Sequence, residues 1–425
     1  METKICVVGL GYVGLPLALL LAEKGFQIYG LDINKEIIEK LKSGACHIND
    51  APLQKRVASQ FKNIRFSTDN AICKEADIIV VTVPTPVDKN HKPDLMALKS
   101  ASADIARNLK KGQLVIIEST IFPATVEGIV QPILESSGLK VGADFSLAHC
   151  PERVDPGNTK YTLVNIPRVV AGITESCTER AYQFYSSFVQ APITKLSSVK
   201  AAEATKMVEN IFRDVNIALV NELAQSFDAS GIDVLEVLKG ASSKPFAFMP
   251  HYPGCGVGGH CIPVDPYYLI ESARLKGFEH RFLSLAREIN NAMPKYTVKK
   301  ALTALQEHNI PIGKAHITVL GMSYKGDVDD MRESPALEIC NELKKAGATF
   351  DVYDPFHKQK STKPSLQSAV ENKDCIIIAT AHSEFRNLTP DFLIKQKVKI
   401  VIDGRNMLDK ETLQGAGIIY KGIGR

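Results

Sequence analysis

The stretch that decides the fold is Lys4-Ile-Cys-Val-Val-Gly9-Leu-Gly11-Tyr12-Val13-Gly14, a short β-rich apolar run that leads into a glycine-rich turn. A helical pattern follows as far as Gly25, and residues 26–32 form a second apolar run. This order predicts strand, helix and strand. At such a turn the first glycine permits the tight bend, the second lets backbone approach a pyrophosphate, and the third lets the helix pack closely on the sheet.

The same alternation continues along the first half of the chain. Further apolar runs occupy residues 77–83, 113–118 and 145–149, with helical segments between them. Near-continuous apolar strands at this spacing are typical of a parallel sheet that helices cover on both faces. The sequence therefore predicts a doubly wound α/β domain, Rossmann-like in its first turn.

A different pattern begins near residue 200. Residues 201–230 contain neither Pro nor Gly, which predicts a helix on the order of 40 Å long. After a glycine-rich loop at 253–259, a strand at 316–321, a helix at 335–346 and a strand ending before Asp354 repeat the first pattern. We expect two Rossmann-like domains, over 1–199 and 311–425, joined by a helical segment over 200–310.

Composition limits the function. The chain has 425 residues, of which 45% are hydrophobic, enough for more than one core. Its 51 basic and 47 acidic residues are interspersed, so nucleic acid is a poor candidate partner. The longest apolar stretches, such as residues 15–22, are shorter than the ~20 residues that cross a bilayer, and no charged leader precedes them, so we expect a cytoplasmic protein. Nine cysteines without a CxxC pair or a ligand spacing disfavour disulfides and a metal site.

Asp32 gives the glycine motif its context. It ends the second predicted strand, eighteen residues after Gly14, where a carboxylate can bind the ribose hydroxyls of NAD and repel a 2′-phosphate. A structural glycine turn is the alternative. Thr85, Pro86 and Thr120 follow the ends of later strands, on the side where ligands bind in such sheets. From position alone they are equally well explained as ordinary loop residues.

The segment Gly256-Val-Gly258-Gly-His-Cys261-Ile-Pro-Val-Asp265-Pro266 is the main candidate for chemistry. Three glycines just before Cys261 remove side chains from around it, so a substrate could reach the sulfur and backbone amides could face a developing negative charge. The alternative is a buried, inert thiol. Asp265-Pro266 would also start a helix, as N-cap and first helical residue. Cys255 and His260 are interpreted as structural.

A polar stripe marks the long predicted helix. Glu203, Lys206, Asn210 and Arg213 are spaced by three, four and three residues, which aligns them on one face. Such a stripe is usually a solvated surface, but if the helix lies between two domains it could face the cleft between them. A lysine ~4 Å from a thiolate contributes about 4 kcal/mol at an effective dielectric of ~20. Lowering a thiol pKa from ~8.5 to near 7 needs only about 2 kcal/mol.

The whole chain resembles the UDP-glucose/GDP-mannose dehydrogenases, and within them the branch that acts on UDP-N-acetylhexosamines. The segment 212–216 is more similar to that acetamido-sugar branch than to the glucose branch. The motifs that carry the resemblance stand at 9–16, 150–154, 206–210, 253–266, 324–335 and 403–405.

The resemblance implies a role for each matching residue. Cys261 would form the thiohemiacetal and thioester, Lys206 and Asn210 would stabilise oxyanions, and Asp265, Thr120 and Glu152 would organise water and proton transfers. NAD would be held by Gly9, Gly11, Tyr12, Val13, Gly14, Asp32, Thr85, Pro86, Thr120 and Arg332. The UDP-sugar would be held by Glu152, Arg153, Lys206, Asn210, Arg213, Tyr252, Gly256, Gly258, Tyr324, Lys325 and Arg405.

The resemblance further implies an NAD-binding domain at 1–199, a dimerisation and catalytic domain at 200–310 and a UDP-sugar-binding domain at 311–425. The expected reaction is a four-electron oxidation of the C6 alcohol of UDP-N-acetylglucosamine to the uronic acid, for surface polysaccharide precursors, by a homodimer or higher oligomer. UDP-N-acetylmannosamine and UDP-glucose are alternative substrates. The competing hypotheses for the function are a two-electron β-hydroxyacid dehydrogenase and a non-catalytic sensor of NAD or nucleotide sugars.

Overall fold

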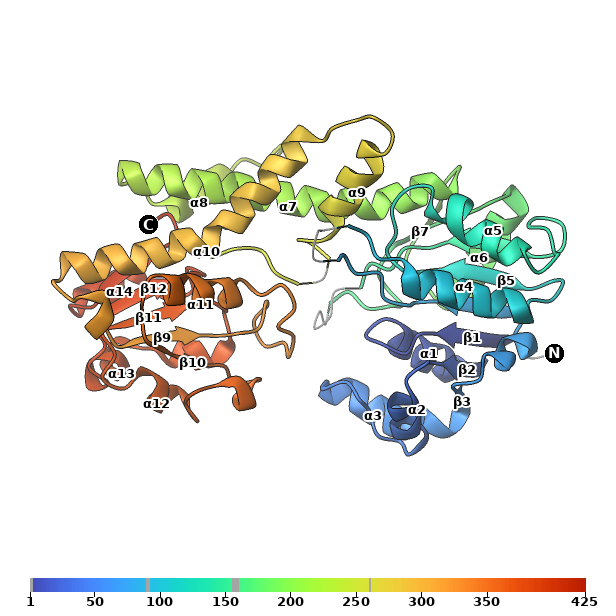
Figure 1. Cartoon of the computed structure of the whole chain (residues 1–425), viewed down its shortest axis with the longest axis horizontal. Helices are drawn as coiled ribbons and strands as arrows, with labels where there is room; N and C mark the ends of the chain where they lie inside the picture. Colours follow the sequence, from blue (N-terminus) through green and yellow to red (C-terminus); the bar gives the residue numbers. More distant parts are fainter. Residues whose placement is uncertain (1–2, 89–91, 155–159, 260) are drawn as a thin grey trace. The chain divides into compact units, whose positions relative to one another are not determined.

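The computed structural model describes residues 3–88, 92–154, 160–259 and 261–425. The chain divides into two compact units, Met1–Glu209 with Tyr267–Gly277 and Asn210–Pro266 with Phe278–Arg425 (Figure 1). Two helices cross the division, α7 (Val199–Ser230) and α9 (Asp265–Arg274). None of the described helices is long and apolar enough to cross a membrane.

The first unit is built on an eight-stranded sheet in the order β3-β2-β1-β4-β5-β6-β7-β8. All neighbouring strands are parallel except β6 and β7, which are antiparallel. The predicted parallel arrangement is confirmed for β1 to β6, whereas β7 and β8 run in the opposite direction, which the apolar pattern does not reveal. The strands are β1 (Lys4–Val8), β2 (Gln27–Leu31), β3 (Ile64–Ser67), β4 (Ile78–Val81), β5 (Leu114–Ile117), β6 (Ser146–His149), β7 (Arg168–Gly172) and β8 (Ile193–Lys195).

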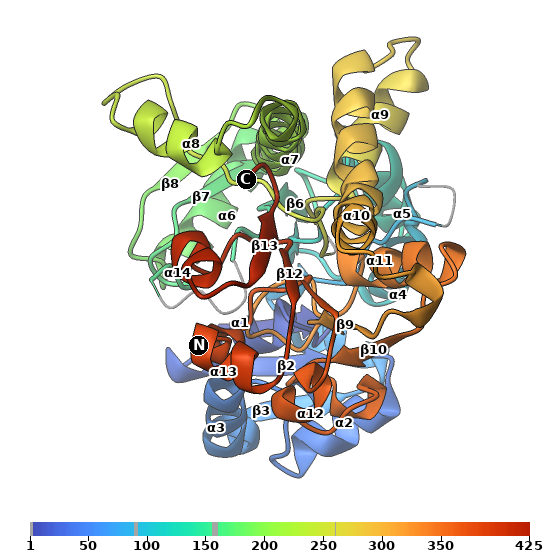
Figure 2. The ribbon, with the colours of Figure 1, turned by 90° about the vertical axis from the view of Figure 1, so that its left-hand side faces the viewer.

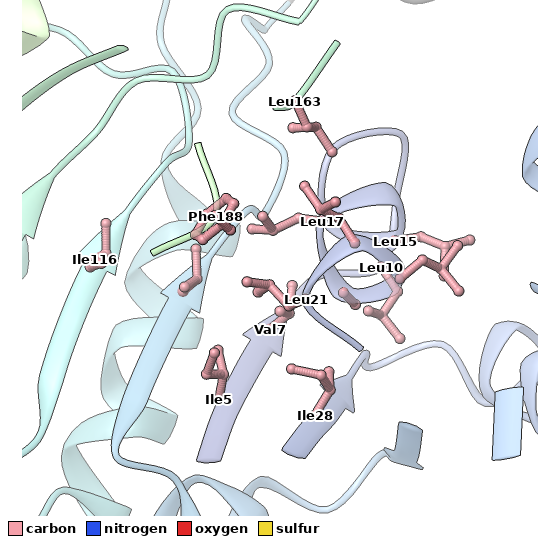
Figure 3. Close-up of a cluster of buried hydrophobic side chains, with 14 of the residues drawn as sticks. Ile5, Val7, Leu10, Leu15, Leu17, Leu21, Ile28, Ile116, Leu163 and Phe188 are labelled. Carbon is pink, nitrogen blue, oxygen red and sulfur yellow. The ribbon is translucent and has the colours of Figure 1, made fainter. Parts of the chain in front are cut away.

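Helix α1 is seated in the core of this unit. Its leucines at positions 15, 17, 19 and 21 are fully buried, as expected of a helix that is apolar all round. Figure 3 shows Leu17 and Leu21 of α1 beside Val7 and Ile28 of the sheet. Burying each such side chain contributes about 1.5–3 kcal/mol. The helices of this unit are α1 (Gly14–Glu23), α2 (Lys35–Lys42), α3 (Ala51–Gln60), α4 (Met96–Asn108), α5 (Gln131–Glu135) and α6 (Glu175–Ser186).

The second unit contains a five-stranded parallel sheet in the order β10-β9-β11-β12-β13. Successive residues of β11 belong to two different cores, Ile377 to the one and Ile376 and Ile378 to the other. Figure 2 shows α10 and α11 on one side of this sheet and α13 and α14 on the other. The strands are β9 (Ile317–Leu320), β10 (Phe350–Tyr353), β11 (Cys375–Ile378), β12 (Ile400–Asp403) and β13 (Ile419–Gly422).

Helices complete the second unit, and the expected fold class of two Rossmann-like sheets joined by a helical segment is confirmed. The long helix predicted over 201–230 is α7, whose later half pairs with α10 through buried polar groups. Asn290 donates to Asp214 at 2.8 Å, and Asn221 donates to Asn290 at 2.9 Å. The helices are α8 (Val234–Ser242), α10 (Arg281–Glu307), α11 (Pro335–Lys345), α12 (Leu366–Val370), α13 (Pro390–Lys395) and α14 (Lys410–Gly415).

Candidate active site

The glycine turn between β1 and α1 has the form that a dinucleotide needs. Gly9 has a φ of +91°, a conformation that residues with a side chain rarely adopt. A Cβ atom on Gly14 would lie 1.9 Å from the Gly9 carbonyl oxygen, so a side chain there is excluded. A Cβ atom on Gly11 would meet nothing within 4 Å, so the turn is open beside the first residues of α1. Backbone N–H groups at a helix start bind phosphate well.

Asp32 lies just beyond β2, at the same edge of the sheet. Its carboxylate accepts hydrogen bonds from the backbone N–H groups of Leu10 and Asn34 at 2.8 and 2.9 Å, and the residue stays partly exposed. Tyr12, in the turn, is 44% exposed, and Val13 is the residue that precedes α1. A carboxylate, an open glycine turn and a helix start together fit the ribose and pyrophosphate of NAD.

The threonines predicted at the ends of later strands are brought together. The Thr85 hydroxyl donates to the carbonyl of Thr120 at 2.6 Å. The Tyr268 hydroxyl in turn donates to the carbonyls of Thr85 and Pro86 at 2.5 and 3.0 Å. Tyr268 comes from α9, far away in the sequence, and no local pattern identifies it as a partner of these loops.

The polar stripe on α7 is not a uniformly solvated surface. Glu203 is fully buried, and its carboxylate accepts from the backbone N–H groups of Ala124 and Val126 at 2.6 and 2.8 Å. Ala124 has a φ of +78°, so this carboxylate holds a strained turn that follows Thr120. Burial raises the pKa of the Glu203 carboxyl to about 7, although its two donors favour the ionised form. Further along the stripe, Lys206 and Asn210 are partly exposed and Arg213 is exposed.

Glu152 is a buried carboxylate in the loop after β6. One oxygen accepts from the backbone N–H groups of Arg153 and Val154 at 2.6 and 2.8 Å. The other lies 3.2 Å from the guanidinium of Arg168. The guanidinium of Arg153 binds Glu209 of α7 and the carbonyl of Pro167.

The cluster behind Glu152 was missed by sequence reasoning. Arg168 also lies 3.4 Å from Glu118, which accepts a 2.5 Å hydrogen bond from the Tyr185 hydroxyl. Burial raises the pKa of the Glu118 carboxyl to about 7, against the opposing effect of Arg168. The available signal was a charged residue directly after an apolar strand, in Ile117-Glu118.

Cys261 stands out among the nine cysteines of the chain. Seven are buried, and only Cys261 and Cys46 are partly exposed. The Cys261 carbonyl accepts from the backbone N–H of Asp265 at 2.8 Å, in the turn that starts α9. The Asp265 carboxylate accepts a 2.5 Å hydrogen bond from the Asn210 side chain. The second unit therefore brings three predicted site residues together, Asn210, Cys261 and Asp265.

The glycines of the cysteine loop lie close to another segment of the second unit. A Cβ atom on Gly258 would lie 2.6 Å from the Glu333 carbonyl oxygen, and one on Gly259 would lie 2.8 Å from the Tyr324 ring. Gly256 has a φ of +133°, and a Cβ atom there would lie 3.1 Å from Pro335. These glycines let the segment 324–335 pack against the loop, a role that the sequence interpretation did not include.

Arg405 and Cys255 anchor the same loop. The Arg405 guanidinium donates to the carbonyls of Ala379 and Gly256 at 2.8 and 3.4 Å. Cys255 is fully buried, its thiol lies 3.2 Å from the carbonyl of Ala379, and burial raises its pKa. A thiol in this position is not an accessible nucleophile. The loop also makes a hydrogen bond that sequence reasoning missed, in which the backbone N–H of Gly254 donates to the side-chain oxygen of Asn221 at 2.9 Å.

The remaining predicted residues lie beside this loop or on its first part. The backbone N–H of Tyr324 donates to the Asp330 carbonyl at 2.9 Å, and Lys325, next to it, is partly exposed. The Arg332 guanidinium pairs with Asp330 at 2.6 Å, and its carbonyl accepts from Gly259 at 3.0 Å. Tyr252 is 63% exposed. His260 lies outside the described residues.

Comparisons with known proteins agree with this arrangement. Three domain descriptions of one family match in order: the NAD binding domain of the UDP-glucose/GDP-mannose dehydrogenase family over residues 3–189, its central domain over 200–292 and its UDP binding domain over 318–410. The chain is 38% identical to a UDP-N-acetyl-D-mannosamine dehydrogenase of Pyrococcus horikoshii over 99% of both chains. It is 36% identical to a UDP-N-acetyl-D-glucosamine 6-dehydrogenase of Pseudomonas aeruginosa over 96% of this chain and 98% of that one.

Solved structures give the same result. The structure of the UDP-D-ManNAc dehydrogenase from Pyrococcus horikoshii matches with a TM-score of 0.93 and 38% identity, over 100% of this chain and 99% of that one. A UDP-glucose dehydrogenase from Pyrobaculum islandicum matches with a TM-score of 0.88 and 26% identity, over 100% and 98%. The chain therefore belongs to the UDP-glucose/GDP-mannose dehydrogenase family, as an oxidoreductase that acts on a CH–OH group of a nucleotide sugar with NAD as its cofactor.

Proposed function

We propose that the protein oxidises the C6 alcohol of a UDP-N-acetylhexosamine to the uronic acid, through a thioester on Cys261, for surface polysaccharide precursors. The observation that carries the proposal is the partly exposed Cys261 beside the Asp265–Asn210 pair. The relatives whose names are acetamido-sugar dehydrogenases, at 36–38% identity over nearly the whole chain, support the substrate class.

Two molecules of NAD, bound in turn, would each accept one hydride, one in each oxidation. Between the two oxidations, the Cys261 sulfur adds to the C6 carbon of the aldehyde and forms a thiohemiacetal, which keeps the aldehyde from escaping. The second oxidation converts this adduct to the thioester. Water then attacks the thioester carbon, the C–S bond breaks with its electron pair on sulfur, and the acid is released. Asp265, with Asn210 bonded to it, is proposed to hold this water and the protons.

Residues of the first unit are proposed to stabilise oxyanions and to take part in the proton transfers. Lys206 carries a fixed positive charge on α7 and would stabilise the oxyanions of the alkoxide and thiohemiacetal. Glu152 would accept the proton of the attacking water, and Thr120 would help to order that water. The roles proposed for binding are NAD at Asp32 and the glycine turn, and the UDP-sugar at Tyr324, Lys325 and Arg405 in the domain 311–425.

The substrate panel tests the proposed function. UDP-N-acetylglucosamine, the substrate expected from the sequence, UDP-N-acetylmannosamine, UDP-N-acetylgalactosamine, UDP-glucose and GDP-mannose are each incubated with NAD, and NADH is counted. We expect two NADH per molecule of one acetamido sugar, and no comparable turnover of UDP-glucose. A single NADH per sugar would indicate a two-electron dehydrogenase, and binding without NADH would indicate a sensor.

A second prediction concerns the choice of cofactor. The Asp32 carboxylate is fixed by two backbone donors, so a 2′-phosphate would lie against a held negative charge. NAD should therefore be preferred to NADP by at least about 100-fold in kcat/KM, from about 3 kcal/mol of like-charge repulsion. Asp32→Ser should narrow this preference, mainly by improving NADP. Equal turnover with both cofactors in the wild type would remove Asp32 from this role.

Assembly is proposed to use α7, in the domain 200–310. Val208, Phe212 and Leu219 are about half exposed, at 59%, 48% and 52%, and their spacing of four and seven residues places them on one face. An apolar stripe on a long helix suits a two-fold interface with a second copy, in which the same residues meet.

The third prediction follows from this stripe. Sedimentation at micromolar concentration should show a dimer or a higher even-numbered oligomer, and Phe212→Glu should weaken it because two like charges would meet at the interface. Glu236→Lys, on α8, reverses a charge at a distance from the stripe and serves as the control. A monomeric wild type at that concentration is the result that rejects the assembly.

A further inference from the structure

A fully buried arginine stands behind Glu152 in the first unit. Arg168 begins β7, and its side chain is 1% exposed. Because β7 runs antiparallel to β6, the first residue of β7 lies at the edge of the sheet where β6 ends. Ligands bind at that edge in sheets of this kind. β7 therefore places the cationic side chain of Arg168 where the loop with Glu152 begins.

The contacts of Arg168 join two carboxylates. Its Nη2 lies 3.2 Å from Glu152 Oε2, and its Nη1 lies 3.4 Å from Glu118 Oε1. A buried guanidinium loses much hydration energy, which only well-placed anions offset. Two further backbone N–H donors, at 2.6 and 2.8 Å from Glu152 Oε1, fix the other oxygen of this carboxylate.

Other side chains fix the guanidinium in place. The Tyr185 hydroxyl donates to Glu118 at 2.5 Å, and the guanidinium lies over the Tyr185 ring, 5.0 Å from its centroid. The Cys150 sulfur lies 3.8 Å from Arg168 Nη1. Glu118 therefore braces the arginine at Nη1, while Glu152 contacts Nη2.

We propose that Arg168, braced by Glu118 and Tyr185, is a positioning residue that holds the Glu152 carboxylate in the orientation needed for hydrolysis of the thioester. The inference rests on the proposed function. In this step Glu152 takes one proton from water as the water oxygen bonds to the thioester carbon. The C–S bond then breaks, and the proton on Glu152 passes to the released thiolate.

The charge of the cluster changes near neutral pH at one of the groups that face Arg168. Burial raises the pKa of the Glu118 carboxyl to about 7, and it raises the pKa of the Cys150 thiol to about 12. The pKa of Tyr185 is far above its ordinary value for the same reason, and burial lowers that of the neighbouring His149 to about 4. Ionised Glu118 attracts the Arg168 guanidinium, which strengthens its hold on the arginine above about pH 7.

Two variants test the role of Arg168. Arg168→Lys keeps the charge but cannot span both carboxylates. The double variant Arg168→Met with Glu118→Gln removes one buried charge of each sign, so that only Glu152 loses its partner. Arg180→Lys is the matched control, because Arg180 bonds Ser146 and Gly112 at the opposite end of β6, at 2.9 and 2.7 Å.

The assay uses the acetamido sugar that the panel selects, with NAD, in single turnovers from pH 5 to 9. Both Arg168 variants should hydrolyse the thioester about 10–100-fold more slowly at pH 7, and the adduct on Cys261 should accumulate in intact-mass spectra. The first hydride transfer and NAD binding should stay near wild type.

A loss of the first hydride transfer by the same factor as the hydrolysis, with no adduct, would mean that Arg168 is merely structural. Wild-type rates in both variants would also overturn the inference. If neither variant folds, Glu118→Gln decides: Arg168 loses its brace, so hydrolysis should slow and the adduct on Cys261 should accumulate, whereas wild-type hydrolysis with no adduct contradicts the proposal. A wild type that forms no adduct and fewer than two NADH per sugar refutes the proposed function instead, independently of Arg168.

Discussion

The turn from β1 into α1 depends on a steric constraint, because the Gly9 carbonyl oxygen occupies the space beside Gly14. A Cβ atom there would come within 1.9 Å of that oxygen and within 2.4 Å of the Thr82 hydroxyl. Because a side chain is excluded at Gly14, α1 lies directly on the sheet and its leucines are buried. The parallel strands then end at one edge, and that edge carries Asp32, Thr85 and Thr120.

The second unit contains a similar glycine turn, after β9, but the aspartate that follows the next strand has different surroundings. Gly321 has a φ of +92°, and Asp354 follows β10 as Asp32 follows β2. Asp354, however, is fully buried and accepts from the backbone of Met322 and Ser323, at 2.6 and 3.0 Å, with His382 Nε2 at 3.0 Å. Its acceptor capacity is used within the protein, whereas Asp32 keeps part of its surface for a ligand. One fold thus gives a carboxylate suited to a ribose in the first unit and a structural one in the second.

The local pattern was sufficient to predict the strands, the long helix and the glycine turn, because apolar periodicity and glycine spacing act over a few residues. It could not reveal that β7 is antiparallel to β6, or that Arg168 meets Glu118, fifty residues earlier in the chain. Pairings of this kind depend on strand order and burial, which a single sequence does not encode locally. The glycines before Cys261 stand out in the sequence, but the segment that packs on them lies about seventy residues further on, so local spacing could not reveal that contact.

The central claim is that the sulfur of Cys261 carries the sugar between the two oxidations. Cys261→Ser tests it most directly, with Cys46→Ser as control, because Cys46 is the other partly exposed cysteine. A hydroxyl is a poor nucleophile without its own base, so steady production of the uronic acid should collapse while NAD and UDP-sugar still bind. The control should keep nearly full activity. If Cys261→Ser instead released two NADH per sugar at the wild-type rate, the covalent mechanism would be wrong.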